Sequence, residues 1–385
     1  MHAKGPERIA ACRHGLAISW LYRGRAAASG RREEKQRLYY LTVRLLGIET
    51  SCDETAAAVV EDSVVRSCVI ASSQAAFRAS GGVIPEHAAR RQLECILPVI
   101  EQALDGVIAD PRTLDAIAVT KGPGLLGSLL IGTTSARVLS HTWGVPLVGV
   151  HHTLGHLSST WLRLPEQEID EPVFPLLALS VSGGHTEIWL RTSHTQGKLV
   201  GRTRDDAAGE AFDKGATLLG LPYPGGPAIA EAAMNGDTSA FVLPSPLKQE
   251  DTLDFSFSGL KTALRYTIRD MGGDPSLRLH DLAASYEAAL CRHLVDRVAR
   301  ACKRFPDVKE VHVVGGVSAN RTLRKMLTDH LPSVAVRAPA AFTYCTDNAA
   351  MIAAAGGFLI EELGEKAYEA FDTVASLGLE EAVKA

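Results

Sequence analysis

Two histidines four residues apart, His152 and His156, have the spacing most suggestive of metal chemistry in this sequence. On a helix, positions i and i+4 lie on one face, close enough for two imidazoles to bind one transition-metal ion. A third ligand must come from elsewhere, and Asp347, in the segment Tyr-Cys-Thr-Asp-Asn, is a candidate. Such a set leaves positions open for a substrate oxygen and suits iron as well as zinc. Taken separately, the histidines could be surface or capping residues, and Asp347 a helix cap.

A tight turn between two predicted strands is a second place where we expect chemistry. Its sequence is Ser-Gly-Gly-His-Thr at residues 182–186. Glycines let backbone N–H groups approach an anion without a Cβ in the way, and the two hydroxyls add donors. The candidate anion-binding residues are Ser182, Gly183, Gly184, His185 and Thr186. An ordinary hairpin turn is the alternative.

The equivalent turn in the first half of the chain, residues 49–55, is rich in acids. Its Asp53 and Glu54 are placed where they could oppose the 182–186 turn. A carboxylate there could accept a proton from a weak nucleophile. The alternative is a solvated turn with no chemical role.

Three further segments suit a nucleotide. A Gly-Gly strand exit at residues 315–316 leads through Asn320 into a predicted helix, a favourable place for a ribose or phosphate. Asp213 has the chemistry to bind ribose hydroxyls, and the Pro-Gly-Gly-Pro loop that contains Gly226 is nearby in sequence. Asn320 could equally be only the N-cap of its helix, and Asp213 only a helix-surface carboxylate.

Several common motifs are absent or incomplete. Residues 122–127 fit GxGxxG, but no acid lies between Asp115 and Glu166, so the ribose-binding acid expected about 20 residues on is missing. The sequence has no Walker A motif. A zincin motif requires glutamate after the first histidine, where this chain has Thr153.

Short apolar runs alternate with helical patterns and predict an α/β fold. The runs are residues 45–48, 56–60, 116–119, 147–150, 176–181, 311–314 and 334–336. One predicted helix, residues 86–104, has a single apolar stripe of Leu93, Ile96, Leu97, Ile100 and Leu104. Pro98 inside it is expected to kink or end the helix.

A weak internal repeat predicts two related domains that face one cleft. Residues 45–60 and 176–190 both read as strand, small polar turn and strand. The Pro- and acid-rich stretch 164–175 is a plausible boundary. We therefore expect domains at 45–170 and 171–385, with a C-terminal helix from about residue 347 closing on the cleft. Residues 1–44 form a basic extension that is not expected to belong to the fold.

The composition is that of an ordinary globular protein, with 385 residues, 46% hydrophobic and 22% charged. No apolar run approaches the ~18 residues of a membrane helix. Seven cysteines without a C-x-x-C pair indicate reduced thiols and a cytoplasmic location. Residues 1–44 carry ten Lys/Arg against three Glu, as in a mitochondrial transit peptide or a start codon placed too early. The remainder has 30 basic and 41 acidic residues, a net of −11, so RNA binding would need a local positive surface or a partner.

Together these segments resemble one family, the tRNA N6-adenosine threonylcarbamoyltransferases, once called O-sialoglycoprotein endopeptidases. The resemblance runs in order from about residue 45 to residue 357. It includes Gly-Ile-Glu-Thr-Ser-Cys-Asp-Glu-Thr, Gly-Gly-Val-Ile-Pro-Glu, Lys-Gly-Pro-Gly, the histidine pair and Ser-Gly-Gly-His-Thr. It continues with Asp-Asp-Ala-Ala-Gly-Glu-Ala-Phe-Asp-Lys, Pro-Gly-Gly-Pro, Phe-Ser-Phe-Ser-Gly-Leu-Lys-Thr, Gly-Gly-Val-Ser-Ala-Asn and Cys-Thr-Asp-Asn-Ala-Ala-Met.

The resemblance implies an actin- and sugar-kinase-like fold with two duplicated α/β domains. It implies transfer of a threonylcarbamoyl group from threonylcarbamoyl-adenylate to N6 of adenosine 37, in tRNAs that read codons starting with A, with release of AMP. It implies that His152, His156 and Asp347 bind iron or zinc. Residues 182–186, Asp213, Gly226 and Asn320 would then bind the adenylate. One departure is His151, where the family usually has Asn.

The resemblance also implies partners: an inactive paralogue of the same fold and a small P-loop ATPase, besides tRNA. Two other classes of enzyme merit comparison. A metallopeptidase would share the metal but needs a glutamate base that this chain lacks next to His152. A sugar kinase or ATPase would share the fold but would not need the histidine pair.

Overall fold

The computed structural model describes residues 43–72, 83–167 and 172–379. Its first sheet contains five strands in the order β3-β2-β1-β4-β5. They are β1 (Arg44–Glu49), β2 (Glu54–Glu61), β3 (Val64–Ser72), β4 (Ala116–Gly122) and β5 (Leu147–His151). The first three strands are antiparallel, and β4 and β5 continue parallel to β1.

The second sheet repeats this plan, with the order β10-β9-β6-β7-β8. Its strands are β6 (Leu176–Val181), β7 (Thr186–Arg191), β8 (Gly197–Arg202), β9 (Glu310–Val314) and β10 (Ala335–Arg337). Again β6, β7 and β8 are antiparallel, while β9 and β10 run parallel to β6. Both halves therefore share one topology, in agreement with the repeat read from the sequence.

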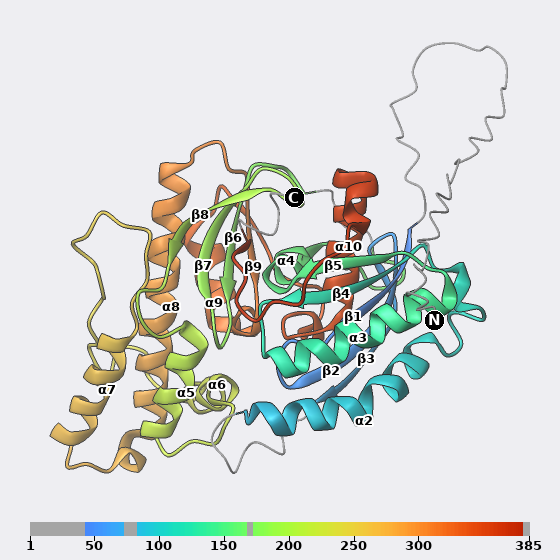
Figure 1. Ribbon diagram of the computed structural model, residues 1–385. Coiled ribbons are helices and arrows are strands. Elements are labelled where there is room, and N and C mark those ends of the chain that lie inside the picture. Colours follow the sequence, from blue (N-terminus) through green and yellow to red (C-terminus); the bar gives the residue numbers. More distant parts are fainter. Residues whose placement is uncertain (1–42, 73–82, 168–171, 380–385) are drawn as a thin grey trace, which may run out of the picture. The chain divides into compact units, whose positions relative to one another are not determined.

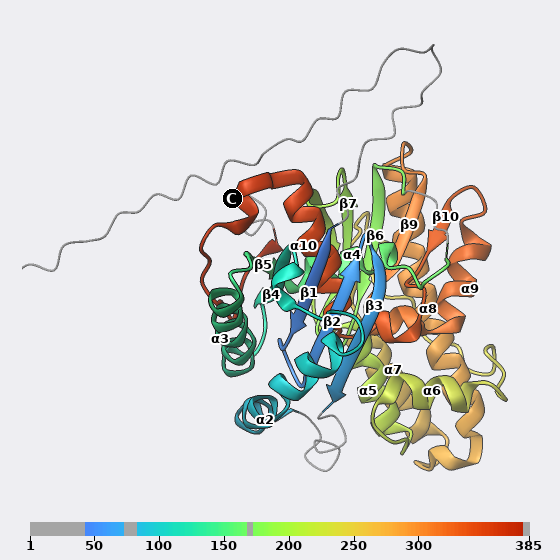
Figure 2. The same ribbon diagram turned by 90° about the vertical axis from the view of Figure 1, so that its right-hand side faces the viewer.

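Helices cover both sheets and fill the space between them (Figures 1 and 2). They are α2 (Pro85–Leu104), α3 (Leu126–Trp143), α4 (His152–Ser158), α5 (Ala208–Leu218), α6 (Gly225–Ala233), α7 (Ser258–Asp270), α8 (Leu279–Arg304), α9 (Arg321–His330) and α10 (Ala349–Leu363). Helices α2 and α3 pack on one face of the first sheet, around Leu46 and Ile48. Helices α5 to α9 pack on one face of the second sheet, around Leu177 and Leu179.

The remaining faces of the two sheets share one apolar core with α4 and α10. Leu45 and Val148 of the first sheet, Ala178 of the second and Ile352 of α10 all belong to it. Gly47 lets α10 approach β1, because a Cβ at this position would lie only 2.1 Å from the carbonyl oxygen of Ala349. The start of α10 is thereby fixed above the centre of the first sheet.

Helix α2 corrects two expectations. Ile96, Ile100 and Leu104 are buried as predicted, but Leu93 and Leu97 are 65% and 55% exposed, so the stripe faces the core only in part. Pro98 does not end the helix, which continues to Leu104. Both leucines therefore belong to an exposed apolar surface rather than to the core.

Over the described part of the chain, no helix is long and apolar enough to cross a membrane. The six described cysteines are free. The basic extension 1–44 lies outside the described residues except for Val43 and Arg44. Arg44 is the first residue of β1, so the fold begins one residue earlier than expected. The division into domains at 45–170 and 171–385 stays a prediction.

Candidate metal and nucleotide site

Helix α4 follows β5 without a loop and presents the histidine pair. Its N-cap is His151, whose Nδ1 accepts a hydrogen bond from the backbone N–H of Thr153 at 3.1 Å, while its Nε2 lies 2.9 Å from the carbonyl oxygen of Leu377. Burial lowers the pKa of His151 to about 4, so its ring is neutral. Both nitrogens of His151 are therefore engaged away from His152 and His156.

Asp347 lies in the loop that leads into α10, and it is not the cap of that helix. The N-cap is Asn348, whose Oδ1 accepts a hydrogen bond from the N–H of Met351 at 2.9 Å. The capping alternative for Asp347 is therefore excluded. Gly155 allows α4 to pack closely on α10, since a Cβ there would lie 2.6 Å from Cδ1 of Ile352.

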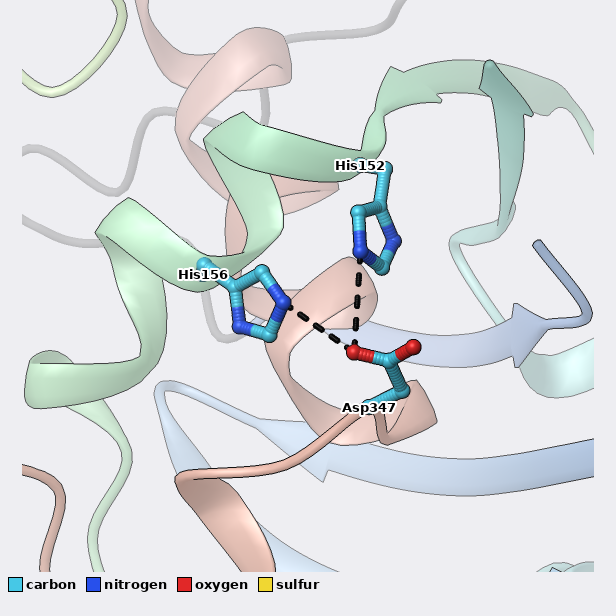
Figure 3. Close-up of side chains that lie close together, drawn as sticks. All are labelled: His152, His156 and Asp347. Carbon is cyan, nitrogen blue, oxygen red and sulfur yellow. Dashed lines mark ion pairs between the residues drawn. The ribbon is translucent and has the colours of Figure 1, made fainter. Parts of the chain in front are cut away.

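The two histidines and the carboxylate meet in one cluster (Figure 3). Oδ1 of Asp347 lies 3.1 Å from Nε2 of His156 and 3.6 Å from Nε2 of His152. The three ligand atoms all lie within 4.8 Å of one another. Residues far apart in the sequence thus form a group that can hold one metal ion, and the donor set of two imidazoles and a carboxylate fits such an ion.

The electrostatics of the cluster suit a cation. Burial by itself would raise the pKa of Asp347, but the charges of His152 and His156 hold it well below its usual range. Burial would lower the pKa of His152, yet Asp347 and Glu49 raise it to about 9. The site therefore favours positive charge between two carboxylates, which either a proton or a metal ion can supply.

Glu49, the last residue of β1, is a site residue that the sequence reasoning missed. Its Oε2 lies 3.1 Å from Nδ1 of His152 and accepts a 2.6 Å hydrogen bond from the hydroxyl of Thr120. Its Oε1 accepts the N–H of Ser51, whose hydroxyl also lies 3.1 Å from Nδ1 of His152. Burial would raise the pKa of Glu49, but His152 lowers it. The available signal in the sequence was a carboxylate directly after the apolar run 45–48.

The 182–186 turn lies between β6 and β7, close to the cluster. Ser182 Oγ accepts hydrogen bonds from the N–H groups of Gly184 and His185, at 3.3 and 3.1 Å, and Thr186 Oγ1 accepts the N–H of Ala208. Burial lowers the pKa of His185, and the charges of His152 and His156 lower it further. The charges of His152 and His156 therefore act on the turn, so the turn lies close to the histidine pair. Gly183 and Gly184 leave open space where a Cβ would stand.

Asp53 and Glu54 lie where β2 begins. Burial, followed by the hydrogen bond to Asp53 and its charge, raises the pKa of Glu54 to about 9. Glu54 thus carries a proton at neutral pH and Asp53 accepts its hydrogen bond. The nearby charge of Asp347 contributes to the same shift, so this acidic turn borders the metal cluster.

Asp213, on α5, contacts the Pro-Gly-Gly-Pro loop, residues 224–227. Asp213 Oδ1 accepts the N–H of Gly225 at 2.7 Å, which fixes Gly226 beside it with open space at its Cα. Burial raises the pKa of Tyr223, and the charges of Asp213 and then Asp53 raise it further. Tyr223 therefore lies between the Asp213 loop and the acidic turn of the first half.

Asn320 is the N-cap of α9, the alternative that the sequence left open. Its Oδ1 accepts the N–H of Leu323 at 2.8 Å, and its Nδ2 donates to Glu287 at 2.6 Å. The preceding Gly315 has φ of 86° and approaches β6 so closely that a Cβ would lie 2.4 Å from the carbonyl oxygen of Val181. The loop is thus held at the end of β6, next to the 182–186 turn.

Comparison with solved structures defines the class of fold. A structure of HypF from T. kodakarensis aligns with a TM-score of 0.56 at 16% identity, over 85% of this chain and 49% of that one. A full-length HypF structure in a phosphate- and nucleotide-bound form aligns with a TM-score of 0.51 at 13% identity, over 85% and 47%. The fold is the actin-like, sugar-kinase-like α/β fold predicted from the sequence.

Sequence comparison defines the family. The profile of the tRNA N6-adenosine threonylcarbamoyltransferases matches residues 64–354. The protein of that name from Thermomicrobium roseum is 48% identical, over 82% of this chain and 92% of its own length. Those from Geobacillus kaustophilus and Bacillus subtilis are 46% and 45% identical, over 88% and 84% of this chain and 97% and 93% of their own lengths. The chain belongs to this family.

Proposed function

We propose that the protein transfers the threonylcarbamoyl group of threonylcarbamoyl-adenylate to N6 of adenosine 37, in tRNAs that read codons starting with A. The adenine N6 attacks the carbamoyl carbon, a bond from that carbon to a phosphate oxygen breaks, and AMP leaves with the electron pair. The observation that carries the proposal is the meeting of His152, His156 and Asp347 beside the 182–186 turn, in a member of this family.

His152, His156 and Asp347 would hold the metal ion, iron or zinc, and Glu49 would orient the His152 ring. When bound, such an ion supplies a Lewis acid that stabilises negative charge on the carbamoyl or phosphate oxygens. Residues 182–186, Asp213, Gly226 and Asn320 are the proposed adenylate-binding set. Support comes from the open space at Gly183, Gly184 and Gly226.

The proton leaving N6 requires an acceptor. Of the two acids proposed from the sequence, Glu54 is already protonated at neutral pH, because its pKa is raised to about 9. Asp53, which shares the hydrogen bond, is therefore the better candidate. It lies in the turn that faces Tyr223 and Asp213 across the two halves of the chain.

We further propose a cytoplasmic protein that works with an inactive paralogue of its own fold and a small P-loop ATPase. The exposed Leu93 and Leu97 on α2, with Leu126 and Leu130 on the neighbouring α3, support a protein contact on this side. The paralogue is the occupant that we propose for this surface. A transit peptide at residues 1–44, and hence a mitochondrial location, is the alternative.

The metallopeptidase and the ATPase or kinase alternatives are less favoured. Thr153 follows the first histidine, where a zincin needs its glutamate, and the family match names a transferase. An ATPase or kinase would not need the cluster of His152, His156 and Asp347.

The decisive experiment mixes the purified full-length protein with synthetic threonylcarbamoyl-adenylate and unmodified tRNA, with and without the partner proteins. Mass spectrometry of the digested RNA should detect threonylcarbamoyl-adenosine. A tRNA with guanosine at position 37 is the matched control and should stay unmodified. Absence of product with all components present would contradict the proposal.

A further inference from the structure

A basic groove lies between α5 and α7, away from the metal cluster. It encloses about 310 Å³ and is lined by Lys214, Thr217, Leu218, Lys261, Thr262 and Arg265. Three of the six lining side chains are cationic and none is acidic. The two helices lie side by side in both views (Figures 1 and 2).

Two sequence segments build this groove, and the lysines that they supply have no role in the proposed chemistry. Residues 205–214 supply Lys214, and residues 255–262 supply Lys261. Asp205 joins them, because its carboxylate accepts hydrogen bonds from the hydroxyls of Ser256 and Ser258, at 2.6 and 2.7 Å. The start of α7 is therefore fixed against the start of α5, and the groove between them is a built feature.

The acidic side chains nearby do not neutralise all of the positive charge in the groove. Lys214 is neutralised by Asp206 and Glu210, each 2.8 Å away. Lys261 forms only a long ion pair, with its Nζ 3.9 Å from Oδ2 of Asp206, an acid that Lys214 already contacts at 2.8 Å. Among the described residues Arg265 forms no ion pair, and its guanidinium lies 5.5 Å from the centre of the Tyr266 ring. Lys261 and Arg265 can therefore bind an external anion.

An exposed aromatic ring adjoins these cations. Tyr266 is 47% exposed and lies between Arg265 and Arg269, whose guanidinium is 4.8 Å from the ring centre. Aromatic and arginine side chains beside a positive groove are the combination by which proteins hold single-stranded or loop RNA, with stacked bases and bound phosphates.

The position of the groove relative to the proposed site supports the same partner. Helix α5 begins at the 182–186 turn, where the N–H of Gly209 donates to the carbonyl oxygen of Ser182 at 3.1 Å. Lys214 and Leu218 are five and nine residues further along, or roughly 8 to 14 Å at the rise of an α-helix. Stacked nucleotides lie about 3.4 Å apart along a duplex axis, and those of an unstacked strand lie further apart, so this distance is on the order of a few nucleotides at most.

We propose that the α5–α7 groove binds the sugar-phosphate backbone of the tRNA a few nucleotides from the adenosine that is modified. This inference rests on the proposed function. It also accounts for RNA binding by a body whose net charge is −11 from residue 45 onward, since 30 basic residues stand against 41 acidic ones. A local positive groove is what such a body needs to hold a polyanion.

The test measures binding of an unmodified tRNA transcript to the full-length protein, alone and with its partners, over a range of salt concentrations. Lys261→Glu with Arg265→Glu should weaken binding at least tenfold at low salt. The slope of log affinity against log salt should become less steep by about 1.5 to 2, the value for two lost phosphate contacts. Tyr266→Ala should weaken binding while leaving the slope unchanged.

The matched control reverses two exposed lysines that do not line the groove, Lys309 just before β9 and Lys325 on α9, as Lys309→Glu with Lys325→Glu. It makes the same change in net charge and should leave the slope unaltered. Lys261→Gln with Arg265→Gln serves as a milder variant, and thermal unfolding checks that each variant is folded. Equal losses in groove and control variants, or unchanged binding by folded groove variants, would overturn the inference.

The outcomes separate the groove from the reaction. If the wild-type protein modifies tRNA and the groove variants bind tRNA normally, the groove assignment is wrong and the function stands. If the groove variants lose salt-dependent binding while the wild-type protein forms no threonylcarbamoyl-adenosine, the reaction is wrong and RNA binding by the groove stands.

Discussion

Glu49 lies 3.1 Å from Nδ1 of His152, on the edge of the ring opposite the nitrogen that faces Asp347. This carboxylate–imidazole pair fixes both the orientation of the ring and the nitrogen that is available for a metal. We expect Glu49→Gln, which keeps the shape and removes the charge, to weaken metal affinity roughly 10- to 100-fold. Competition with a chelator measures this metal affinity. Glu86→Gln, an exposed glutamate on α2, is the control, and equal affinities in both variants would contradict the positioning role.

Asp347 and its neighbour Asn348 separate metal binding from helix capping. Asp347→Asn should abolish stoichiometric metal binding and lower tRNA modification at least 100-fold, while the N-cap of α10 is kept. Asn348→Ala removes the cap and should lower the free energy of unfolding by about 1 kcal/mol while the ligand set is kept. Metal analysis and calorimetric unfolding of both variants check this. Metal retained by Asp347→Asn would refute the ligand assignment.

Metal uptake should release a proton. In the metal-free protein the pKa of His152 is about 9, above its ordinary value, so the ring is protonated at neutral pH and must lose that proton to bind a metal. Affinity should therefore rise by about tenfold per pH unit up to about pH 9. Calorimetry in buffers of different ionisation enthalpy counts the protons, and none released at pH 7 would contradict the assignment.

The same pKa has a consequence for the stability of the metal-free protein. Because the folded-state pKa of His152 is raised, its contribution to stability is fully present below the unfolded value of about 6.5. It is lost as the pH rises toward 9. His152→Gln should flatten the stability–pH curve in that window, as denaturant titrations at several pH values would show.

Glu54 and Asp53 should respond differently to amide substitution. Glu54 is protonated below its raised pKa of about 9, so Glu54→Gln resembles the native state and should keep turnover within a few-fold. Asp53→Asn removes the proposed proton acceptor and should slow turnover 100-fold or more. Single-turnover transfer rates of the two variants measure this difference. Unchanged turnover in the double variant would eliminate this acidic turn from the chemistry.

Gly47 should be intolerant of any side chain. A Cβ would lie 2.1 Å from the carbonyl oxygen of Ala349, so Gly47→Ala must push the start of α10, and Asp347 with it, away from the histidines. We expect a loss of about 1 to 3 kcal/mol in stability and a weaker metal site. Gly357→Ala, whose Cβ would meet only Cδ1 of Leu45 at 3.4 Å, is the control. Equal stabilities would show that α10 yields at this contact.

The metal cluster could be predicted because its parts carry local signals. The i, i+4 spacing of His152 and His156 indicates a shared face, and the resemblance to a family points to Asp347. Glu49 was missed because a carboxylate after an apolar run does not reveal its partners, and its role depends on β1 and β5 ending at one place in the first sheet. The exposure of Leu93 and Leu97 was also hidden, since a helical stripe does not reveal how wide a face its neighbours cover. For Asn320 the sequence left two roles open, because asparagine can serve as a helix cap or as a ligand. The structure shows the cap.

The position of α10 affects how the chain can fold as it is synthesised. Residues of this helix such as Ile352 cover the inner face of a sheet whose strands end at His151, some two hundred residues earlier. While the ribosome is still making the second sheet, Leu45 and Val148 have no such cover. The nascent chain therefore presents an apolar sheet surface for most of its translation, the kind of surface that chaperones bind.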